Sequence, residues 1–334
     1  MCLQSRGGWA MTSFARPRVV VSRCLGFDAC RWNGATIPDD YVDALKPFVD
    51  FIKVCPEVDI GLGVPRKSIR LIESAGSLRL IQQDTNRDVS ADMTKFADMF
   101  LDNLRDIDGF ILKSRSPSCG IKDSRVYPDI GKVASIRNAP GLFGGTVLKR
   151  FPRLAIEDEG RFNNERIWDH FLKKLFTLAG FRERVLVGDI NDLIKFHSQN
   201  KMLLMSYNQN EMRTMGRIVS NKEGKRFEEV AIEYRSHLGS ALANIPRPTS
   251  TINVALHMLG FSSDSLSHAE KAYFLDSIDR YRNGTIPIAV LTYMLKSWAI
   301  RFDQTYMLAQ TFLDPYPSDL LKVIKTGEPR DLKL

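Results

Sequence analysis

Three short apolar runs, each followed by a loop that carries a cysteine, constrain the fold of this 334-residue chain more than any other feature. The runs lie at 19–21, 51–54 and 110–112, and their loops carry Cys24, Cys55 and Cys119. Helical patterns at 39–50 and 90–108 separate them, with Ser90 expected to cap the second helix. Strands that alternate with helices predict an α/β domain with a mostly parallel sheet. Because sites gather beyond the carboxyl ends of such strands, we expect the three loops to meet.

The rest of the chain has a different pattern, which is helical from about residue 189 onward. Proline and glycine residues divide it into candidate helices at 189–219, 223–243, 249–260, 265–282 and 287–312. We therefore predict an α/β N-terminal domain followed by an all-α C-terminal domain. The expected parts are a loose leader (1–14), the α/β domain (15–150), a linker and bridging helix that begins near Asn164 (151–188), and the helical domain (189–325).

Charge and hydropathy indicate where in the cell the protein resides and what class of partner it binds. No apolar run approaches the length of a membrane helix, and the first ten residues do not resemble a signal peptide, so we expect a cytoplasmic protein without a membrane partner. The net charge of +8 favours an anionic partner, with nucleic acid as the first choice. A soluble protein with a basic surface is equally compatible with this charge, and the sequence leaves monomer and dimer open.

The five cysteines all lie within the first 119 residues. Their odd number favours metal binding or catalysis over a disulfide framework. The chain has no C-x-x-C pair, so a structural zinc site is not indicated. Three thiolates on loops can ligate an iron–sulfur cluster and leave one iron open for a substrate atom. Cys30 is either a fourth ligand or a packing residue, and we favour packing; Cys2, in the leader, has no expected role.

Five segments in the first domain carry a resemblance to a known family. In chain order they are VSRCLG, CRWNG, VCPEVDIGLGVPR, DVSADM and LKSRSPSCG, and together they resemble the thiouracil desulfidase family over roughly residues 15–150. The later stretch FHSQNKMLLMSYNQNEMRTMGRIV resembles a second family of unknown function, often fused to the first, over roughly 190–315. The pair of domains is similar to the tRNA 4-thiouridine desulfidases.

This resemblance implies a cofactor, a reaction and a set of residues. The cofactor is a [4Fe–4S] cluster held by Cys24, Cys55 and Cys119, with one open iron that takes the sulfur of a thiolated base. The substrate is 4-thiouridine in tRNA, the products are uridine and sulfide, and no net redox change occurs. Glu57, in the CPE segment, is the candidate for moving protons to and from the attacking water, and Ser116 is the second catalytic candidate.

The sequence leaves alternative roles open for several of these side chains. Ser118 is a weaker candidate than Ser116, and Glu57 could simply pair with Arg66 or Lys53. Arg66 either holds a substrate phosphate or caps its loop. The remaining candidates for RNA contacts, which could equally be solvated charges, are Lys113, Arg115, His197, Lys201, Arg213 and Arg217. Gly144 and Gly145 are expected to form a turn, because no phosphate-loop signature follows them.

The sequence is compatible with three functions. The first is an enzyme that removes sulfur from tRNA, with the helical domain holding the tRNA. The second is an enzyme that acts on a free thiolated base or nucleotide. The third is a nucleic-acid-binding protein whose cluster is structural or senses redox state. The basic helical domain favours the first, because a small substrate needs no docking surface of that size.

Overall fold

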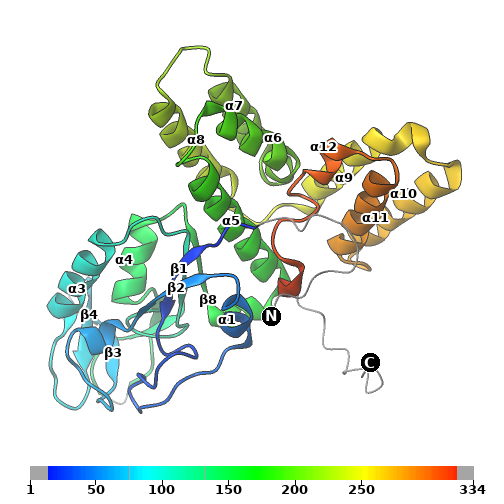
Figure 1. Ribbon diagram of the computed structural model, residues 1–334. Helices are drawn as coiled ribbons and strands as arrows, with labels where there is room; N and C mark the ends of the chain where they lie inside the picture. Colours follow the sequence, from blue (N-terminus) through cyan, green and yellow to red (C-terminus); the bar gives the residue numbers. More distant parts are fainter. Residues whose placement is uncertain (1–13, 75, 132, 322–334) are drawn as a thin grey trace, which may run out of the picture.

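The N-terminal α/β prediction is confirmed by a computed structural model, which describes residues 14–74, 76–131 and 133–321 (Figure 1). A four-stranded sheet has the order β2-β1-β5-β8, and its three neighbouring pairs all run parallel. Its strands are β1 (Arg18–Ser22), β2 (Asp50–Val54), β5 (Gly109–Leu112) and β8 (Ala155–Asp158). Most of the predicted leader, with Cys2, lies outside the described residues, as do residues 322–325 of the predicted helical domain.

Helices cover both faces of this sheet. Successive side chains of a strand point to opposite faces, so Val20 packs into one apolar core while Val19 and Val21 pack into another. The first core includes side chains of α3 and α4, and the second includes side chains of α1 and α5. These helices are α1 (Asp40–Leu45), α3 (Ser90–Asp102), α4 (Leu142–Arg150) and α5 (Glu165–Arg184). The result is the three-layered arrangement that the alternating pattern requires.

A second sheet, which the sequence analysis did not predict, packs on the α3/α4 side. Its order is β4-β3-β6-β7; β3 pairs antiparallel with β4 and parallel with β6, and β6 pairs antiparallel with β7. Leu71 and Leu80 are register partners across β3 and β4, and both are buried in the same core as Val20. The strands are β3 (Ile69–Ser74), β4 (Ser77–Gln82), β6 (Ser124–Tyr127) and β7 (Arg137–Ala139).

Two local predictions in this domain are wrong. Ser90 is the first residue of α3 rather than its cap, which is Val89. The Ser90 hydroxyl instead donates to Asp88 Oδ1 over 2.6 Å and accepts from the Leu80 amide over 2.7 Å, which ties the helix to β4. Gly144 and Gly145 lie within α4 and not in a turn; the packing that requires a glycine at 144 is described with the site below.

The C-terminal region is helical, as predicted, but the helix expected at 189–219 is two helices. Asn208 ends the first and caps the second: its backbone is extended (φ −153°), and its side chain accepts from the amides of Asn210 and Glu211. The helix expected at 287–312 is also divided. The helices are α6 (Ile190–Tyr207), α7 (Gln209–Ser220), α8 (Phe227–Ala241), α9 (Pro248–Ser262), α10 (His268–Arg282), α11 (Ile288–Arg301) and α12 (Thr305–Leu308).

Helix α5 connects the two regions, as Figure 1 shows. Its residues Trp168 and Leu172 are buried in a core that includes β1, whereas Leu178 and Phe181 are buried in the core of α6–α12. The predicted linker at 151–188 contains β8, the edge strand of the parallel sheet, so its first part belongs to the α/β domain. The remaining short helices are α2 (Pro56–Asp59), η1 (Glu159–Asn163), η2 (Ser263–Ser265) and η3 (Ser318–Leu320).

The segment after α12 returns to the first domain. Tyr316 and Leu320 are buried in the core that also contains Val19 and Val21. The indole of Trp168 donates from Nε1 to the Leu320 carbonyl over 3.1 Å. The described part of the chain contains no helix long and apolar enough to cross a membrane.

Candidate functional site

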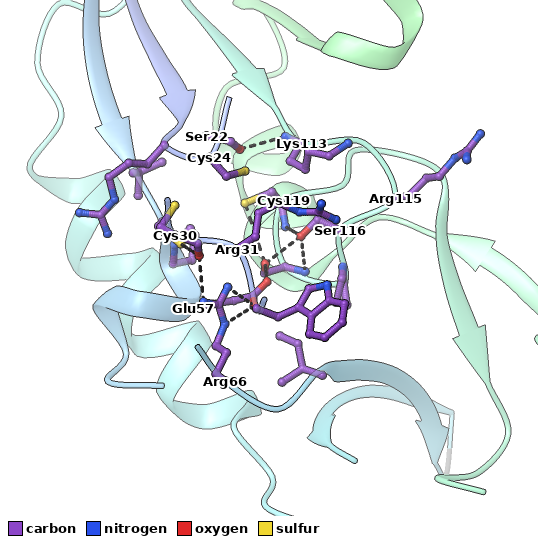
Figure 2. Close-up of a pocket in the computed structure, with 18 of the residues that line it drawn as sticks. Ser22, Cys24, Cys30, Arg31, Glu57, Arg66, Lys113, Arg115, Ser116 and Cys119 are labelled. Carbon is purple, nitrogen blue, oxygen red and sulfur yellow. Dashed lines mark hydrogen bonds and ion pairs between the residues drawn. The ribbon is translucent and has the colours of Figure 1, made fainter. Parts of the chain in front are cut away.

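A cavity of about 350 Å³ lies where β1, β2 and β5 end (Figure 2). Its wall includes the segments that follow each of these strands, so residues distant in sequence share one space. The ends are held together by the backbone: the Arg23 amide donates to the Val54 carbonyl over 2.8 Å, and the Lys113 amide donates to Ser22 Oγ over 2.9 Å. The parallel arrangement of these strands is what brings the loops to one edge.

The cavity is lined by the three predicted cluster ligands and also by Cys30. Cys55 and Cys119 are buried and Cys24 is half-buried, and all four of these thiols are free. The Cys30 thiol lies within hydrogen-bonding reach of the Cys24 and Cys55 thiols. Burial raises the pKa of Cys119 to about 12, and the contact with Cys30 followed by burial raises the pKa of Cys55. These thiols therefore stay protonated unless a cation compensates their charge.

Thiols on a shared wall are the kind of donor that an iron–sulfur cluster uses. Among the residues that the structure describes, no group of three or more His, Cys, Asp or Glu side chains is placed to hold one metal ion. Each thiolate of a cubane binds a different iron, so the sulfur ligands of a cluster stand farther apart than those of one ion. Cys24, Cys55 and Cys119 supply the soft donors that iron–sulfur clusters use. The choice of these three as ligands stays a prediction.

Glu57, the first residue predicted to be catalytic, has both carboxylate oxygens engaged. It lies in the short helix α2, two residues after Cys55. Its Oε1 accepts from Ser118 Oγ over 2.6 Å, and its Oε2 accepts from Arg66 Nε over 2.9 Å and Nη2 over 2.7 Å. The Arg66 side chain is only 4% exposed and also donates to the Cys30 carbonyl over 2.9 Å. Of the two roles considered for Arg66, these contacts favour holding its loop.

The two serines differ in what they touch. Ser116 Oγ accepts from the Cys119 amide over 3.0 Å and from the Ser118 amide over 3.3 Å, so it shapes the loop that carries Cys119. Ser118, which the sequence analysis ranked below Ser116, is the serine that contacts Glu57, and its hydroxyl lies 3.0 Å from that of Ser116. The three side chains form the row Ser116–Ser118–Glu57 along the cavity wall.

Comparison with known proteins decides which family this site belongs to. Residues 19–159 match the family described as 2-thiouracil desulfurase. The chain belongs to this family. Residues 201–317 match a second family, described as a protein of unknown function (DUF1722). The first match contains all the cysteines of the cavity, and we refer to residues 19–159 as the desulfurase domain.

Individual relatives match one part of the chain at a time. The uncharacterised protein YbbK of Bacillus subtilis is 30% identical over 109 residues, which are 30% of this chain and 72% of the relative. The uncharacterised protein YbgA of Escherichia coli is 22% identical over 157 residues, which are 46% of this chain and 93% of the relative. A solved structure described as the [4Fe-4S]-dependent thiouracil desulfidase TudS is 25% identical, with a TM-score of 0.36, and the match covers 44% of this chain and 94% of that one.

Close packing of α4 against the Cys119 loop holds the desulfurase site in shape. The Gly144 amide donates to the Ser118 carbonyl over 2.9 Å. A Cβ atom at position 144 would lie 2.3 Å from the Gly120 carbonyl oxygen, whereas one at 145 would come no closer than 3.4 Å to its nearest neighbour, Pro140. Only glycine therefore fits at 144, and the loop and the helix define each other's position.

Lys113 and Arg115, two predicted RNA contacts, lie at the edge of the desulfurase cavity. Lys113 Nζ forms an ion pair with Glu159 and donates to Ser114 Oγ over 2.9 Å, so the protein already partners this cation. The Arg115 side chain is 84% exposed and points away from the cavity (Figure 2). Contact with RNA phosphate stays a prediction for both.

The predicted contacts in the helical domain separate into two kinds. Lys201, Arg213 and Arg217 are exposed. His197 is half-buried, its Nδ1 lies 3.2 Å from Tyr234 Oη, and burial lowers its pKa to about 4. A neutral ring offers no charge to a phosphate, so a contact between His197 and RNA would be a hydrogen bond or a stacking contact, and it stays a prediction.

Trp32 is a lining residue that the sequence analysis did not single out. It lines the cavity, yet it is 50% exposed. Its carbonyl accepts from the Arg66 amide over 2.8 Å, so its backbone is fixed next to Arg66, the residue that pairs with Glu57. An exposed indole beside a polar cavity is suited to stacking on a planar ring. Its place in the CRWNG segment, which carries part of the family resemblance, could have indicated that it lies at the site.

Proposed function

We propose that the cavity holds a [4Fe–4S] cluster on Cys24, Cys55 and Cys119, and that the enzyme removes the sulfur of 4-thiouridine in tRNA. The observation that carries the proposal is the convergence of three separate cysteine loops on one cavity that also holds the hydrogen-bonded pair Ser118–Glu57. The membership in the 2-thiouracil desulfurase family supports the reaction type.

The reaction is a hydrolysis in which a thiocarbonyl and water give a carbonyl and hydrogen sulfide. When bound through three thiolates, the cluster supplies an iron with an open position, which acts as a Lewis acid toward a soft sulfur atom. No electrons are gained or lost in this sum. Two protons leave the attacking water and two are taken up by the departing sulfur, so the chain must supply a group that accepts and returns protons.

Glu57 and Ser118 are placed to do this. Glu57 Oε1 accepts the Ser118 hydroxyl over 2.6 Å, and a water that displaces this hydroxyl would find the same acceptor. Arg66 holds the other carboxylate oxygen from the opposite side, which orients Glu57 and leaves Oε1 facing Ser118. Glu57 then acts as the general base toward water, Ser118 orients the water or the base, and Ser116 holds the Cys119 loop.

Trp32 completes the site on its open side. A nucleobase is a planar ring, and stacking on an aromatic side chain contributes about 1–3 kcal/mol per base. The exposed indole on the cavity wall would position the base so that its thiocarbonyl points inward toward the cysteines.

The helical domain supports a macromolecular substrate. The net charge of the chain is +8, and Lys201, Arg213 and Arg217 of α6 and α7 are exposed. Phosphate contacts of this kind position a nucleic acid without reading its sequence. A desulfidase for free thiolated bases would have no use for this surface. A nucleic-acid-binding protein with a structural or redox-sensing cluster would also use it, and what favours the enzyme over that alternative is the Glu57–Ser118 pair beside the cysteines.

The test uses the full chain, purified without oxygen and loaded with iron and sulfide. Bulk tRNA that contains 4-thiouridine is the substrate, and the readouts are loss of its near-ultraviolet band and release of sulfide. We expect both with wild type and neither with Glu57→Gln. If the protein desulfurated free 4-thiouracil but not tRNA, the proposed substrate would be wrong and the proposed reaction would stand. If a protein that carries the cluster turned over neither tRNA nor free 4-thiouracil, the proposal that it is a desulfidase would be wrong.

A further inference from the structure

A second cavity, of about 380 Å³, lies among β8, the first half of α5 and the segment after α8. Its lining includes Glu157, Arg161, His170, Phe171, Lys174 and Ile245, and none of its residues lines the cysteine cavity. It is therefore a separate space, to which the proposed desulfuration assigns no role.

Lys174 is the unusual residue of this cavity. It is only 7% exposed, yet the described residues offer its ammonium group no hydrogen bond and no ion pair. Its neighbour Lys173 is different, because it pairs with Asp169 over 2.7 Å. Burial lowers the pKa of Lys174 to about 8. An unpaired buried ammonium is costly for a fold, so its presence on a cavity wall indicates a partner that comes from outside.

The other polar groups show which charge this partner carries. Glu157 Oε1 is already engaged, by Arg161 Nη1 over 3.0 Å and by the Asp158 amide over 3.1 Å. Burial lowers the pKa of His170 to about 4, so its ring is neutral, and its Nδ1 lies 3.0 Å from Tyr207 Oη. The donors left to bind something are the Lys174 ammonium and the remaining N–H groups of Arg161. Glu157 Oε2 makes no hydrogen bond among the described residues, and burial raises the pKa of Glu157 to about 7, so this carboxyl can also be protonated and donate to an anion.

We propose that this cavity is a binding site for a phosphate group, held by Lys174 and Arg161. A phosphate offers several acceptor oxygens, which suit the three donors of a lysine together with the planar fork of an arginine. Lys174 supplies the buried charge at the bottom of the site, while Arg161, whose side chain is 41% exposed, stands at its rim. Phe171 and Ile245 give the cavity apolar walls on which the rest of a phosphate ester can rest.

The direct test is calorimetric titration of the full chain with inorganic phosphate at constant ionic strength. We expect wild type to bind one phosphate, and Lys174→Met to bind at least about tenfold more weakly, a loss of about 1.4 kcal/mol. Lys195→Met, which changes an exposed lysine on α6, is the matched control and should bind as wild type does. If wild type does not bind phosphate, or if Lys174→Met binds it as tightly as wild type does, the proposed site is wrong.

Removing the buried charge gives a second readout. Methionine fills similar space without a charge, so Lys174→Met should melt at a higher temperature than wild type without phosphate. Phosphate should raise the melting temperature of wild type but not that of the variant. Arg161→Gln changes a side chain that is 41% exposed, at the cost of its ion pair with Glu157, and should weaken phosphate binding by itself. It keeps the test valid if Lys174→Met folds poorly.

The phosphate can come from an RNA backbone or from a small ester, and RNA titrations separate the two. If it belongs to RNA, Lys174→Met should weaken tRNA binding and reduce the slope of log K against log salt by about one. If it belongs to a small ester, tRNA binding stays unchanged, and a nucleoside monophosphate competes with inorganic phosphate in wild type. Because no arm requires iron, failure here and failure of the desulfidase proposal are distinguishable.

Discussion

In the desulfurase domain, Glu57, Arg66 and Ser118 are shielded from solvent, and each contacts at least two partners across the cavity wall. In the helical domain, Lys201 and Arg213 are exposed, and within the described residues the Arg217 side chain donates to Thr214 of its own helix over 3.0 Å. Chemistry needs fixed geometry, whereas attraction of a phosphate backbone needs only charge in roughly the right place. Single substitutions should therefore have large effects in the first region and small, additive effects in the second.

The largest effect should come from the thiol ligands. Cys55→Ser should lose cluster iron and reduce desulfuration by about 100-fold or more, since even outer-shell changes at metal sites cost up to that factor. Cys30→Ser should keep both, because only three ligands are proposed. Iron content per chain and the visible absorption of the purified protein measure this. Loss of iron in Cys30→Ser would instead make it the fourth ligand.

Glu57→Gln should come next. Losing a general base costs about 10²–10⁴ in kcat, and the cluster should remain. The variant also leaves Arg66 buried without its anion, so the melting temperature should fall. Glu73→Gln, which makes the same change in an ion pair with Arg137 outside the cavity, is the control and should change kcat little. A Glu57→Gln enzyme with wild-type kcat would show that the carboxylate only anchors Arg66.

The contact between α4 and the Cys119 loop can be tested with adjacent glycines. Gly144→Ala places a methyl group against the Gly120 carbonyl, and overpacking of this kind costs about 1–3 kcal/mol. We expect a lower free energy of unfolding together with reduced cluster content. Gly145→Ala meets no such contact and should retain both, as measured by denaturant titration and iron analysis. Equal behaviour of the two variants would mean that the loop moves away at no cost.

A smaller effect is expected at the open side of the cavity. Trp32→Ala should raise KM for the thiolated base with kcat nearly unchanged, by the factor of about 5–150 that corresponds to 1–3 kcal/mol of stacking. Trp32→Phe should recover most of the loss, since it keeps an aromatic face. Steady-state kinetics on tRNA and on the free base would show whether both substrates use the indole. A fall in kcat alone would exclude a stacking role.

The smallest effects should appear on the helical surface. Arg213→Gln and Arg217→Gln should each weaken tRNA binding a few-fold and lower the salt slope by about one, with no change in melting temperature. Filter binding over a range of salt concentrations measures both quantities. If either variant abolished binding, the surface would be a focused site like the cavity, and the contrast between the two regions would fail.

The sequence predicted the parts of the site that depend on strand order and missed those that depend on packing. Alternating apolar runs and helices were enough to place Cys24, Cys55 and Cys119 at one edge of a parallel sheet. They could not tell that Ser118 rather than Ser116 faces Glu57, because that depends on how Ser116 folds the loop. The second sheet was missed although Ile69–Ser74 and Ser77–Gln82 alternate, with Gly76 at φ +73° between them.

Features made by contacts between the domains gave no sequence signal. Lys174 lies in an ordinary amphipathic helix, and only the packing of α5 against β8 and the segment after α8 shows that its charge is buried and alone among the described residues. The contact between His197 and Tyr234 gave no sequence signal either, since helical spacing says nothing about how neighbouring helices pack.

The return of Tyr316 and Leu320 to the core of the first domain has a consequence for biogenesis. During synthesis, the cysteine-bearing domain emerges first, but one side of its core stays uncovered until residue 320 has left the ribosome. Domains that form early usually fold as independent units. Here one side of the first domain's core is completed only after the helical domain has been synthesised, so a cluster on the proposed cysteines would be loaded into a chain whose helical domain is already made.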